Sequence, residues 1–164
     1  MKHLLIIRHA KSSWDFINME DFDRPLNDRG KADAPLMAKR LLKKDIKIDA
    51  FISSPAVRAL TTATYFVKAY DIKPKHIIQI TELYEAPAKI FAQVVAGIDP
   101  AVKTAAIFAH NPGITDYAST LTKVNIDNIP TCGIFAIKAP VKEWIDFEDA
   151  EKEFWFFDYP KANG

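Results

Sequence analysis

Four short apolar runs, each followed by a longer segment with helical periodicity, constrain the fold of this chain most. The runs are rich in β-branched and aromatic residues, whereas the longer segments repeat apolar residues at the spacing of a helix face. The runs are residues 3–7, 49–53, 76–80 and 105–109, and the helical segments are residues 31–44, 56–70, 88–96 and 113–123. This alternation is typical of parallel strands joined by crossover helices. It predicts an α/β fold of three layers, with a mostly parallel central sheet flanked by helices on both faces.

The sequence after residue 123 changes character. Residues 133–138 and 153–159 are apolar or aromatic runs separated by Pro140 and a charged stretch, and we expect them to add antiparallel strands at the sheet edge. Pro35 interrupts the first helical segment, which predicts either a later start or a kink there. A chain of 164 residues without a linker or repeat has the length of one ordinary domain, so we expect a single domain over residues 1–164.

The charges balance, with 22 Lys and Arg against 21 Asp and Glu and a net charge of +1. No overall field is therefore expected to attract nucleic acid or an anionic membrane. The apolar stretch at residues 4–7 is too short for a signal-peptide core or a membrane span. Cys132 is the single cysteine, which excludes an intramolecular disulfide. We expect a cytoplasmic protein, and the oligomeric state stays open.

Reactive side chains follow each of the four predicted parallel strands. The carboxyl ends of parallel strands meet at one edge of a sheet, which is where ligands bind in open α/β folds. The candidates are Arg8 and His9 after the first run, Arg58 in the helical segment after the second, Glu82 and Glu85 after the third, and His110 after the fourth. Each alone also fits an ordinary surface loop or helix turn. Their shared edge predicts a site with two imidazoles, two guanidiniums and a carboxylate.

The chemistry of such a set is narrow. Guanidinium groups match the oxygens of a phosphate, and two helix starts, predicted to be capped by Ser54 and Asn111 with a proline after each, would add backbone donors. A neutral imidazole in this anion pocket can attack phosphorus, while a protonated one stabilises the equatorial oxygens. A nearby carboxyl group can protonate the leaving oxygen.

Several strings resemble a known family in the right order. L-I-I-R-H-A-K, from Leu5 to Lys11, resembles the Arg-His-Gly signature of the histidine phosphatase superfamily, also called phosphoglycerate mutase-like, although Ala10 replaces the usual glycine. Further matches are Leu26, Gly30 and Ala34 as spaced L, G and A, the S-x-x-x-R-A-x-x-T-A string of residues 54–63, and the A-H-N-P-G string of residues 109–113. The resemblance covers residues 3 to about 114. The H-N-P-G string and the short chain resemble the SixA-like branch, whose members lack a large insertion over the site.

The resemblance implies a metal-independent phosphatase with no cofactor. It implies a phosphohistidine intermediate on His9 and a phosphate pocket completed by Arg8, Arg58 and His110. The segment Leu83-Tyr84-Glu85 resembles the one that often supplies the acid, so Glu85 takes that role and Glu82 stays as its substitute. The implied substrate is a phosphorylated small molecule, such as a phosphate monoester, or a phosphohistidine-bearing protein.

Other chemistries fit less well. A cysteine phosphatase needs an arginine six positions after its cysteine, but Lys138 stands there. Asp21 could suggest an aspartyl-phosphate enzyme, but no apolar strand precedes it, which favours a loop. The sequence contains neither G-x-x-x-x-G-K-[ST] nor G-x-G-x-x-G, so it gives no support for a nucleotide-binding site. The four histidines lack the spacing of a zinc site, so no metal is expected.

Two functional alternatives and one local question remain. The same pocket would suit a phospho-binding module without turnover. A phosphomutase is less favoured, because the chain is short for a lid that encloses the substrate. Lys11, Ser12 and Ser13 follow the proposed nucleophile and fit phosphate contacts and a flexible polar loop equally well.

Overall fold

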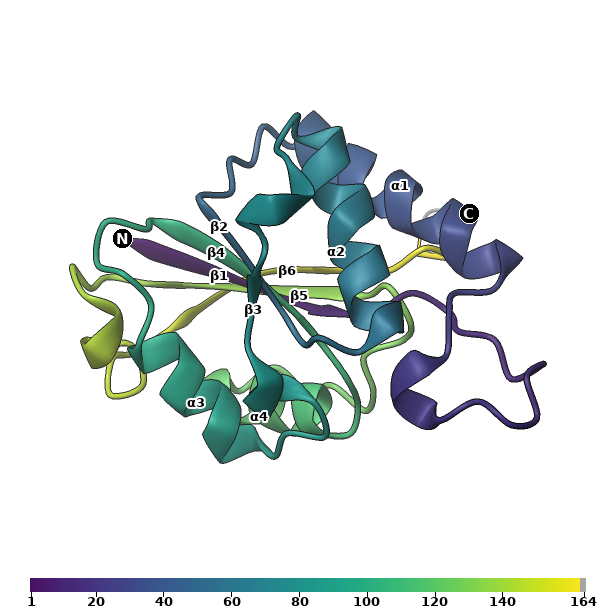
Figure 1. Ribbon diagram of the computed structural model, residues 1–164. Coiled ribbons are helices and arrows are strands. Elements are labelled where there is room, and N and C mark those ends of the chain that lie inside the picture. Colours follow the sequence, from purple (N-terminus) through teal and green to yellow (C-terminus); the bar gives the residue numbers. More distant parts are fainter. Residues whose placement is uncertain (163–164) are drawn as a thin grey trace.

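The computed structural model describes residues 1–162 and contains, within them, a six-stranded sheet in the order β3-β2-β4-β1-β5-β6 (Figure 1). The strands are β1 (Lys2–Arg8), β2 (Ala50–Ser53), β3 (Ile78–Gln79), β4 (Thr104–Ala109), β5 (Ile134–Ala139) and β6 (Glu153–Asp158). Strands β1 to β4 run parallel to one another, whereas β5 is antiparallel to β1 and β6 to β5. The mostly parallel sheet is confirmed. Of the two late strands only β6 forms an edge, because β5 pairs with β1 on its inner side.

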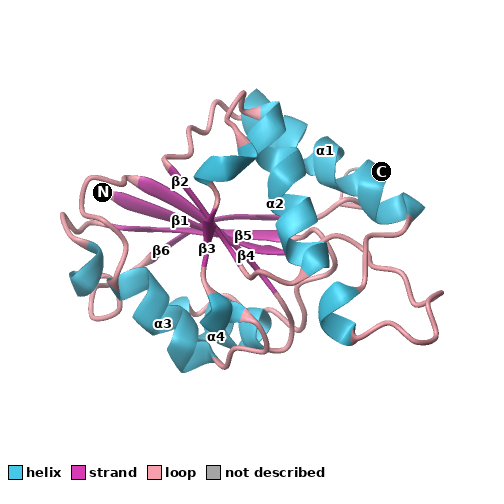
Figure 2. Cartoon of the chain, in the orientation of Figure 1, coloured by secondary structure: helices cyan, strands magenta, loops and turns pink. Residues whose placement is uncertain are grey.

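Helices cover both faces of the sheet, as Figure 2 shows, and this confirms the three-layer α/β architecture. They are α1 (Asp28–Lys43), α2 (Val57–Ala69), α3 (Ala88–Ala96) and α4 (Gly113–Leu121). The pair α1 and α2 lies on one face, and the pair α3 and α4 lies on the other (Figure 1). None of the helices within residues 1–162 is both long and apolar enough to span a bilayer.

Strand β1 shows how one sequence run serves two cores. Successive side chains of a strand point to opposite faces, and here both faces are buried. Leu4 and Ile6 belong to the core beneath α3 and α4, whereas Leu5 and Ile7 belong to the core beneath α1 and α2. All four are fully buried. The continuous apolar character of the run therefore follows from its central position in the sheet.

The first helix differs from the sequence-based expectation at its start. It begins at Asp28, because the Asn27 side chain caps it by accepting a hydrogen bond from the Gly30 amide at 2.9 Å. It then continues through Pro35, so of the two alternatives at Pro35, a later start or a kink, the later start is wrong. Proline removes one backbone hydrogen bond from a helix interior. Ala34 and Met37, on either side of Pro35, are fully buried in the core beneath the helix.

Two other local predictions are corrected. The predicted strand of residues 76–80 shortens to Ile78–Gln79, because a 3-10 helix at Pro74–His76 replaces its start. The predicted cap at Ser54 is wrong, since α2 begins at Val57 after Ala56, which makes no side-chain cap. At α4, Pro112 occupies the cap position, but the Asn111 side chain accepts from the Thr115 amide at 3.3 Å and so still serves the helix start.

Candidate active site

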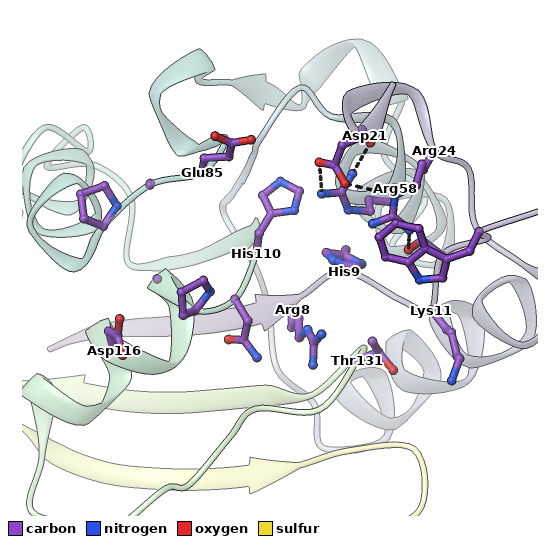
Figure 3. Close-up of a pocket in the computed structure, with 17 residues that line it drawn as sticks. Arg8, His9, Lys11, Asp21, Arg24, Arg58, Glu85, His110, Asp116 and Thr131 are labelled. Carbon is purple, nitrogen blue, oxygen red and sulfur yellow. Dashed lines mark hydrogen bonds and ion pairs between the residues drawn. The ribbon is translucent and has the colours of Figure 1, made fainter. Parts of the chain in front are cut away.

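The five candidate site residues of the sequence line one pocket of about 750 Å³ beyond the carboxyl ends of β1, β2 and β4. They are Arg8, His9, Arg58, Glu85 and His110. The tertiary structure therefore brings together side chains that lie up to about a hundred residues apart in the chain. Glu82, the substitute for Glu85, does not line the pocket. Figure 3 shows His9 and His110 side by side in the pocket, with Glu85 and Asp21 on different sides of His110.

His9 directly follows β1 and is held by its backbone. Its amide donates to the Ala109 carbonyl at 3.1 Å, and its carbonyl accepts from the Cys132 amide at 3.0 Å. In the side chain, Nδ1 lies 2.7 Å from the Ala10 carbonyl oxygen, which can only accept, so Nδ1 carries the proton. The other ring nitrogen, Nε2, is then unprotonated in the neutral imidazole.

The surroundings keep His9 neutral. Burial is the largest cause that lowers its pKa, to about 3, and the charge of His110 in its protonated form and the charges of Arg58 and Arg8 act in the same direction. The hydrogen bond to Ala10 opposes this shift but does not reverse it. At neutral pH, His9 thus presents a nitrogen lone pair in a cationic pocket.

His110 follows β4 and faces His9, with ring centroids 5.2 Å apart and an angle of 52° between the rings. Its Nε2 lies 2.8 Å from the Ser54 hydroxyl. Its Nδ1 is buried and has no hydrogen-bond partner among residues 1–162. Burial, followed by the charge of Arg58, lowers the pKa of His110 to about 4. Ser54, predicted as a helix cap, therefore orients the second imidazole instead.

Arg8 and Arg58 each keep a buried Nε–H without a partner among the described residues 1–162. One terminal nitrogen of Arg8 donates to the Ile129 carbonyl at 3.0 Å. The terminal nitrogens of Arg58 donate to the Asp21 carbonyl at 2.6 Å and to its carboxylate at 2.9 Å. Unsatisfied buried donors are costly, so two of them beside His9 indicate a pocket prepared for an anion.

Asp21 binds Arg58 and is itself held by Arg24 and Tyr84, and sequence reasoning missed these three as site residues. The Asp21 carboxylate accepts from Arg58, from Arg24 Nε at 3.1 Å and from the Tyr84 hydroxyl at 2.7 Å. Partial burial pushes the pKa of Asp21 up, but these hydrogen bonds and the charge of Arg58 lower it to about 2. Asp21 lies in a short 3-10 helix, Asp21–Asp23, inside a loop, where no periodicity marks it. The only sequence feature that could have pointed to Asp21 as a site residue is the nearby Arg24.

The segment after His9 is pinned between α1 and α2. The Ala10 amide donates to the Thr62 hydroxyl at 2.9 Å, and that hydroxyl donates to the Arg58 carbonyl at 2.8 Å. On the other side, a Cβ at Gly30 would lie 2.2 Å from the Lys11 carbonyl oxygen, so only glycine permits this approach. Gly30 and Thr62, both singled out in the sequence, thus fix the backbone that carries His9.

The remaining sequence candidates fall into two groups. Glu85 is exposed, has a φ of 56°, and lies at the pocket rim. Lys11 and Ser12 also line the pocket, and the Ser12 hydroxyl accepts from Arg24 at 2.7 Å. Ser13 is not part of the lining. Its hydroxyl instead accepts from the Asp15 amide at 3.1 Å, so it shapes the loop.

Two alternative chemistries find no support in the described part of the chain. Burial raises the pKa of the Cys132 thiol well above its usual range, so it is not a thiolate nucleophile. Within residues 1–162, no group of three or more His, Cys, Asp or Glu side chains is arranged to hold a metal ion.

Comparison with known proteins gives consistent matches. A sequence model of the histidine phosphatase superfamily (branch 1) matches residues 4–90, slightly more than half of the 164 residues. An uncharacterised chloroplastic protein of Arabidopsis thaliana is 26% identical over 151 residues, which cover 87% of this chain and 69% of that protein. SixA of Agrobacterium tumefaciens superposes with a TM-score of 0.82 at 23% identity, over 97% of this chain and 98% of SixA.

A second solved structure, the protein histidine phosphatase SixA complexed with tungstate, superposes with a TM-score of 0.78 at 20% identity. The superposition covers 96% of this chain and 97% of that one. Both SixA structures share the fold of this chain over almost its whole length.

Proposed function

This chain belongs to the histidine phosphatase superfamily, and we propose that it hydrolyses a phosphate monoester or a protein phosphohistidine through a phosphohistidine intermediate on His9. The observation that carries this proposal is the tautomer of His9. Its Nδ1–H is bound to the Ala10 carbonyl, so the lone pair of Nε2 is free for attack on phosphorus.

In the first step, Nε2 of His9 attacks the phosphorus in line with the leaving group. The N–P bond forms, and the bond from phosphorus to the leaving oxygen or nitrogen breaks. The charge on the transferring group is met by the unpartnered Nε–H donors of Arg8 and Arg58 and by Nδ1 of His110. The approach of a phosphate dianion favours the protonated form of His110.

Glu85 completes the proton balance. As a carboxylic acid it protonates the leaving group in the first step, and as a carboxylate it accepts a proton from water in the second. That water attacks the phosphorus, the bond to His9 breaks, and orthophosphate leaves with His9 neutral again. The position of Glu85 at the rim, on the far side of His110 from Asp21, suits a group that meets the leaving atom (Figure 3).

Two findings support the choice of substrate class. The fold is shared with a SixA protein histidine phosphatase that holds tungstate, a tetrahedral oxyanion. The similarity to SixA structures extends over nearly the whole chain, which favours a phosphohistidine-bearing protein as partner. The pocket would bind a phosphate monoester through the donors named above, which belong to Arg8, Arg58 and His110.

A phospho-binding module without turnover is the second candidate. The observation that favours it is the exposure of Glu85, because burial does not hold this carboxyl group at one place near the leaving atom. Calorimetry with phosphate and phosphopeptides, alongside an activity assay, separates the two functions. Tight binding without hydrolysis identifies the module.

The test of the enzyme is rapid-quench labelling with a ³²P-labelled phospho-substrate in EDTA. We expect acid-labile phosphate on the wild-type protein and none on His9→Ala. His76→Ala, which removes an exposed imidazole outside the pocket, should label like the wild type. Turnover by wild type without a labelled intermediate, together with full activity of His9→Ala, would overturn the mechanism. Loss of turnover in EDTA that added metal restores would overturn metal independence.

A further inference from the structure

The loop between β1 and α1 exposes apolar side chains beside the pocket. Four of the ten exposed large apolar side chains in residues 1–162 lie between residues 14 and 19, namely Trp14, Phe16, Ile17 and Met19. Ile17 is 96% exposed and Phe16 is 52% exposed. In Figure 1 this dark purple loop projects away from the sheet and its helices. Such a cluster on a water-facing surface is typical of an interaction site.

The base of the loop is tied down, whereas its tip is free of the core. The Ser13 amide donates to the Pro25 carbonyl at 2.8 Å, and Arg24 bonds the Ser12 hydroxyl at 2.7 Å. The Arg24 guanidinium also covers the Trp14 ring at 3.5 Å from the ring centre. Since Arg24 is buried and bound to Asp21, the loop starts from a fixed point of the pocket wall.

The loop is continuous with the pocket. Trp14 lines the pocket, but Phe16 and Ile17 do not. Three residues of extended chain span about 10 Å, so Phe16 and Ile17 lie within that reach of the pocket mouth. A small phosphorylated molecule inside the pocket would leave them exposed. A polypeptide that carries the phosphoryl group would continue over them.

The charge of the loop indicates the chemistry of that polypeptide. Between Lys11 and Arg24 the sequence holds four acidic residues, Asp15, Glu20, Asp21 and Asp23, and no Lys or Arg. All four acids are exposed, but Arg24 and Arg58 bind the Asp21 carboxylate, so the negative charge within residues 14–20 comes from Asp15 and Glu20. An apolar tip among carboxylates favours a partner with apolar and basic side chains and disfavours an anionic membrane surface.

We propose that residues 14–20 form a docking loop for a phosphorylated protein substrate. Apolar side chains of the substrate bury Phe16 and Ile17, and lysines or arginines near its phosphorylated residue face the carboxylates of Asp15 and Glu20. This inference rests on the proposed function and adds the substrate feature that the loop selects. The pocket receives the phosphoryl group, and the loop distinguishes a protein from a small molecule.

The test compares the wild type with Phe16→Ser/Ile17→Ser on three substrates. These are free phosphohistidine and two synthetic phosphohistidine peptides, one with Lys and Leu on both sides of the phosphorylated residue and one with Glu and Ser. We expect the double variant to lose at least about tenfold in kcat/KM on the Lys/Leu peptide, because the buried anchors are gone. On free phosphohistidine it should stay within about twofold of the wild type. Ile145→Ser, an exposed apolar residue outside the pocket, is the matched control and should change neither value.

Any other result contradicts the docking loop or the proposed function, as follows. Equal losses on peptide and free phosphohistidine, or no wild-type preference for the Lys/Leu peptide, overturn the docking loop and leave the proposed function intact. If none of the three substrates is hydrolysed, the phosphohistidine part of the proposed function fails, and the labelling test decides the phosphate monoester part. Fluorescence anisotropy with phosphonate analogues of both peptides then tests the loop, which requires a loss of about tenfold in affinity in the double variant. Sedimentation provides the last control. A wild-type dimer that the double variant abolishes, with peptide binding unchanged, identifies the loop as a contact between two copies and overturns the proposal.

Discussion

Asp21 holds both terminal nitrogens of Arg58, the one through its backbone carbonyl at 2.6 Å and the other through its carboxylate at 2.9 Å. These contacts orient the guanidinium so that its Nε–H is left without a partner among residues 1–162. They also place a negative charge at the wall of an anion pocket. Asp21 therefore both positions Arg58 and weakens the positive field of the pocket, which on the proposed function attracts the phosphate.

We predict that Asp21→Asn binds oxyanions more tightly. The amide oxygen can still accept from Arg58, although the amide nitrogen cannot accept from Arg24 as the second carboxylate oxygen does. Because the negative charge is removed, inhibition by tungstate should strengthen by about three- to tenfold. Asp23→Asn, which removes a nearby charge outside the pocket lining, is the control. Inhibition constants at fixed ionic strength measure the effect. Weaker inhibition of Asp21→Asn would show that its hold on Arg58 outweighs its charge.

Thr62→Val should disturb the segment that carries His9. It leaves the buried Ala10 amide without an acceptor, so we expect a loss of about 1–3 kcal/mol in the free energy of unfolding and a lower kcat/KM. Thr64→Val removes only the hydrogen bond from the Thr64 hydroxyl to the Leu60 carbonyl on the same helix. Its effect on the free energy of unfolding should stay within about 0.5 kcal/mol. Urea denaturation compares the two. Equal stability and activity in both variants would contradict the role given to Thr62.

Gly113→Ala should displace the segment next to Glu85. A Cβ at position 113 would lie 1.9 Å from the Ala86 carbonyl oxygen, so the backbone must shift, at a cost of about 1–3 kcal/mol. At Gly97 the nearest atoms would be 3.6 Å from the added Cβ, and Gly97→Ala should be tolerated. Denaturation midpoints and kcat report the difference. A fully stable and active Gly113→Ala would mean that the Ala86 segment yields without cost.

Glu85→Gln should lower kcat on a phosphate monoester by at least about tenfold, because the leaving alkoxide loses its proton donor. Glu82→Gln should leave kcat unchanged, since Glu82 lies outside the pocket lining. A series of esters with leaving groups of rising pKa measures the effect, which should grow along the series. The reverse pattern between the two variants would assign the acid to Glu82.

Stability should fall as the pH drops from 6.5 towards 4. The pKa values of His9 and His110 are about 3 and about 4 in the folded chain, below the 6.5 of an unperturbed imidazole. The unfolded chain therefore binds up to two more protons in this window, which predicts a slope of at most about 2.7 kcal/mol per pH unit from these two groups. Urea unfolding at several pH values measures it. His110→Asn should reduce the slope by about half of that amount, and an unchanged slope would contradict the burial effect.

The sequence by itself determined the α/β fold and the common edge of its strand-end residues. Continuous apolar runs such as residues 3–7 must be buried on both faces, and parallel strands necessarily end at one edge. Once the sheet was predicted, Arg8, His9, Arg58 and His110 had to lie near one another.

Only the tertiary structure decided which loop closes the pocket and how the imidazoles are oriented. The contact of Asp21 with Arg58 spans 37 positions, and that of Ser54 with His110 spans 56. Neither follows from local periodicity, because each depends on how an irregular segment packs over the completed sheet. For the same reason the sequence predicted Ser54 as a helix cap and Asp21 as an ordinary loop residue. Long-range packing placed Asp21 in the pocket wall and Ser54 against the ring of His110.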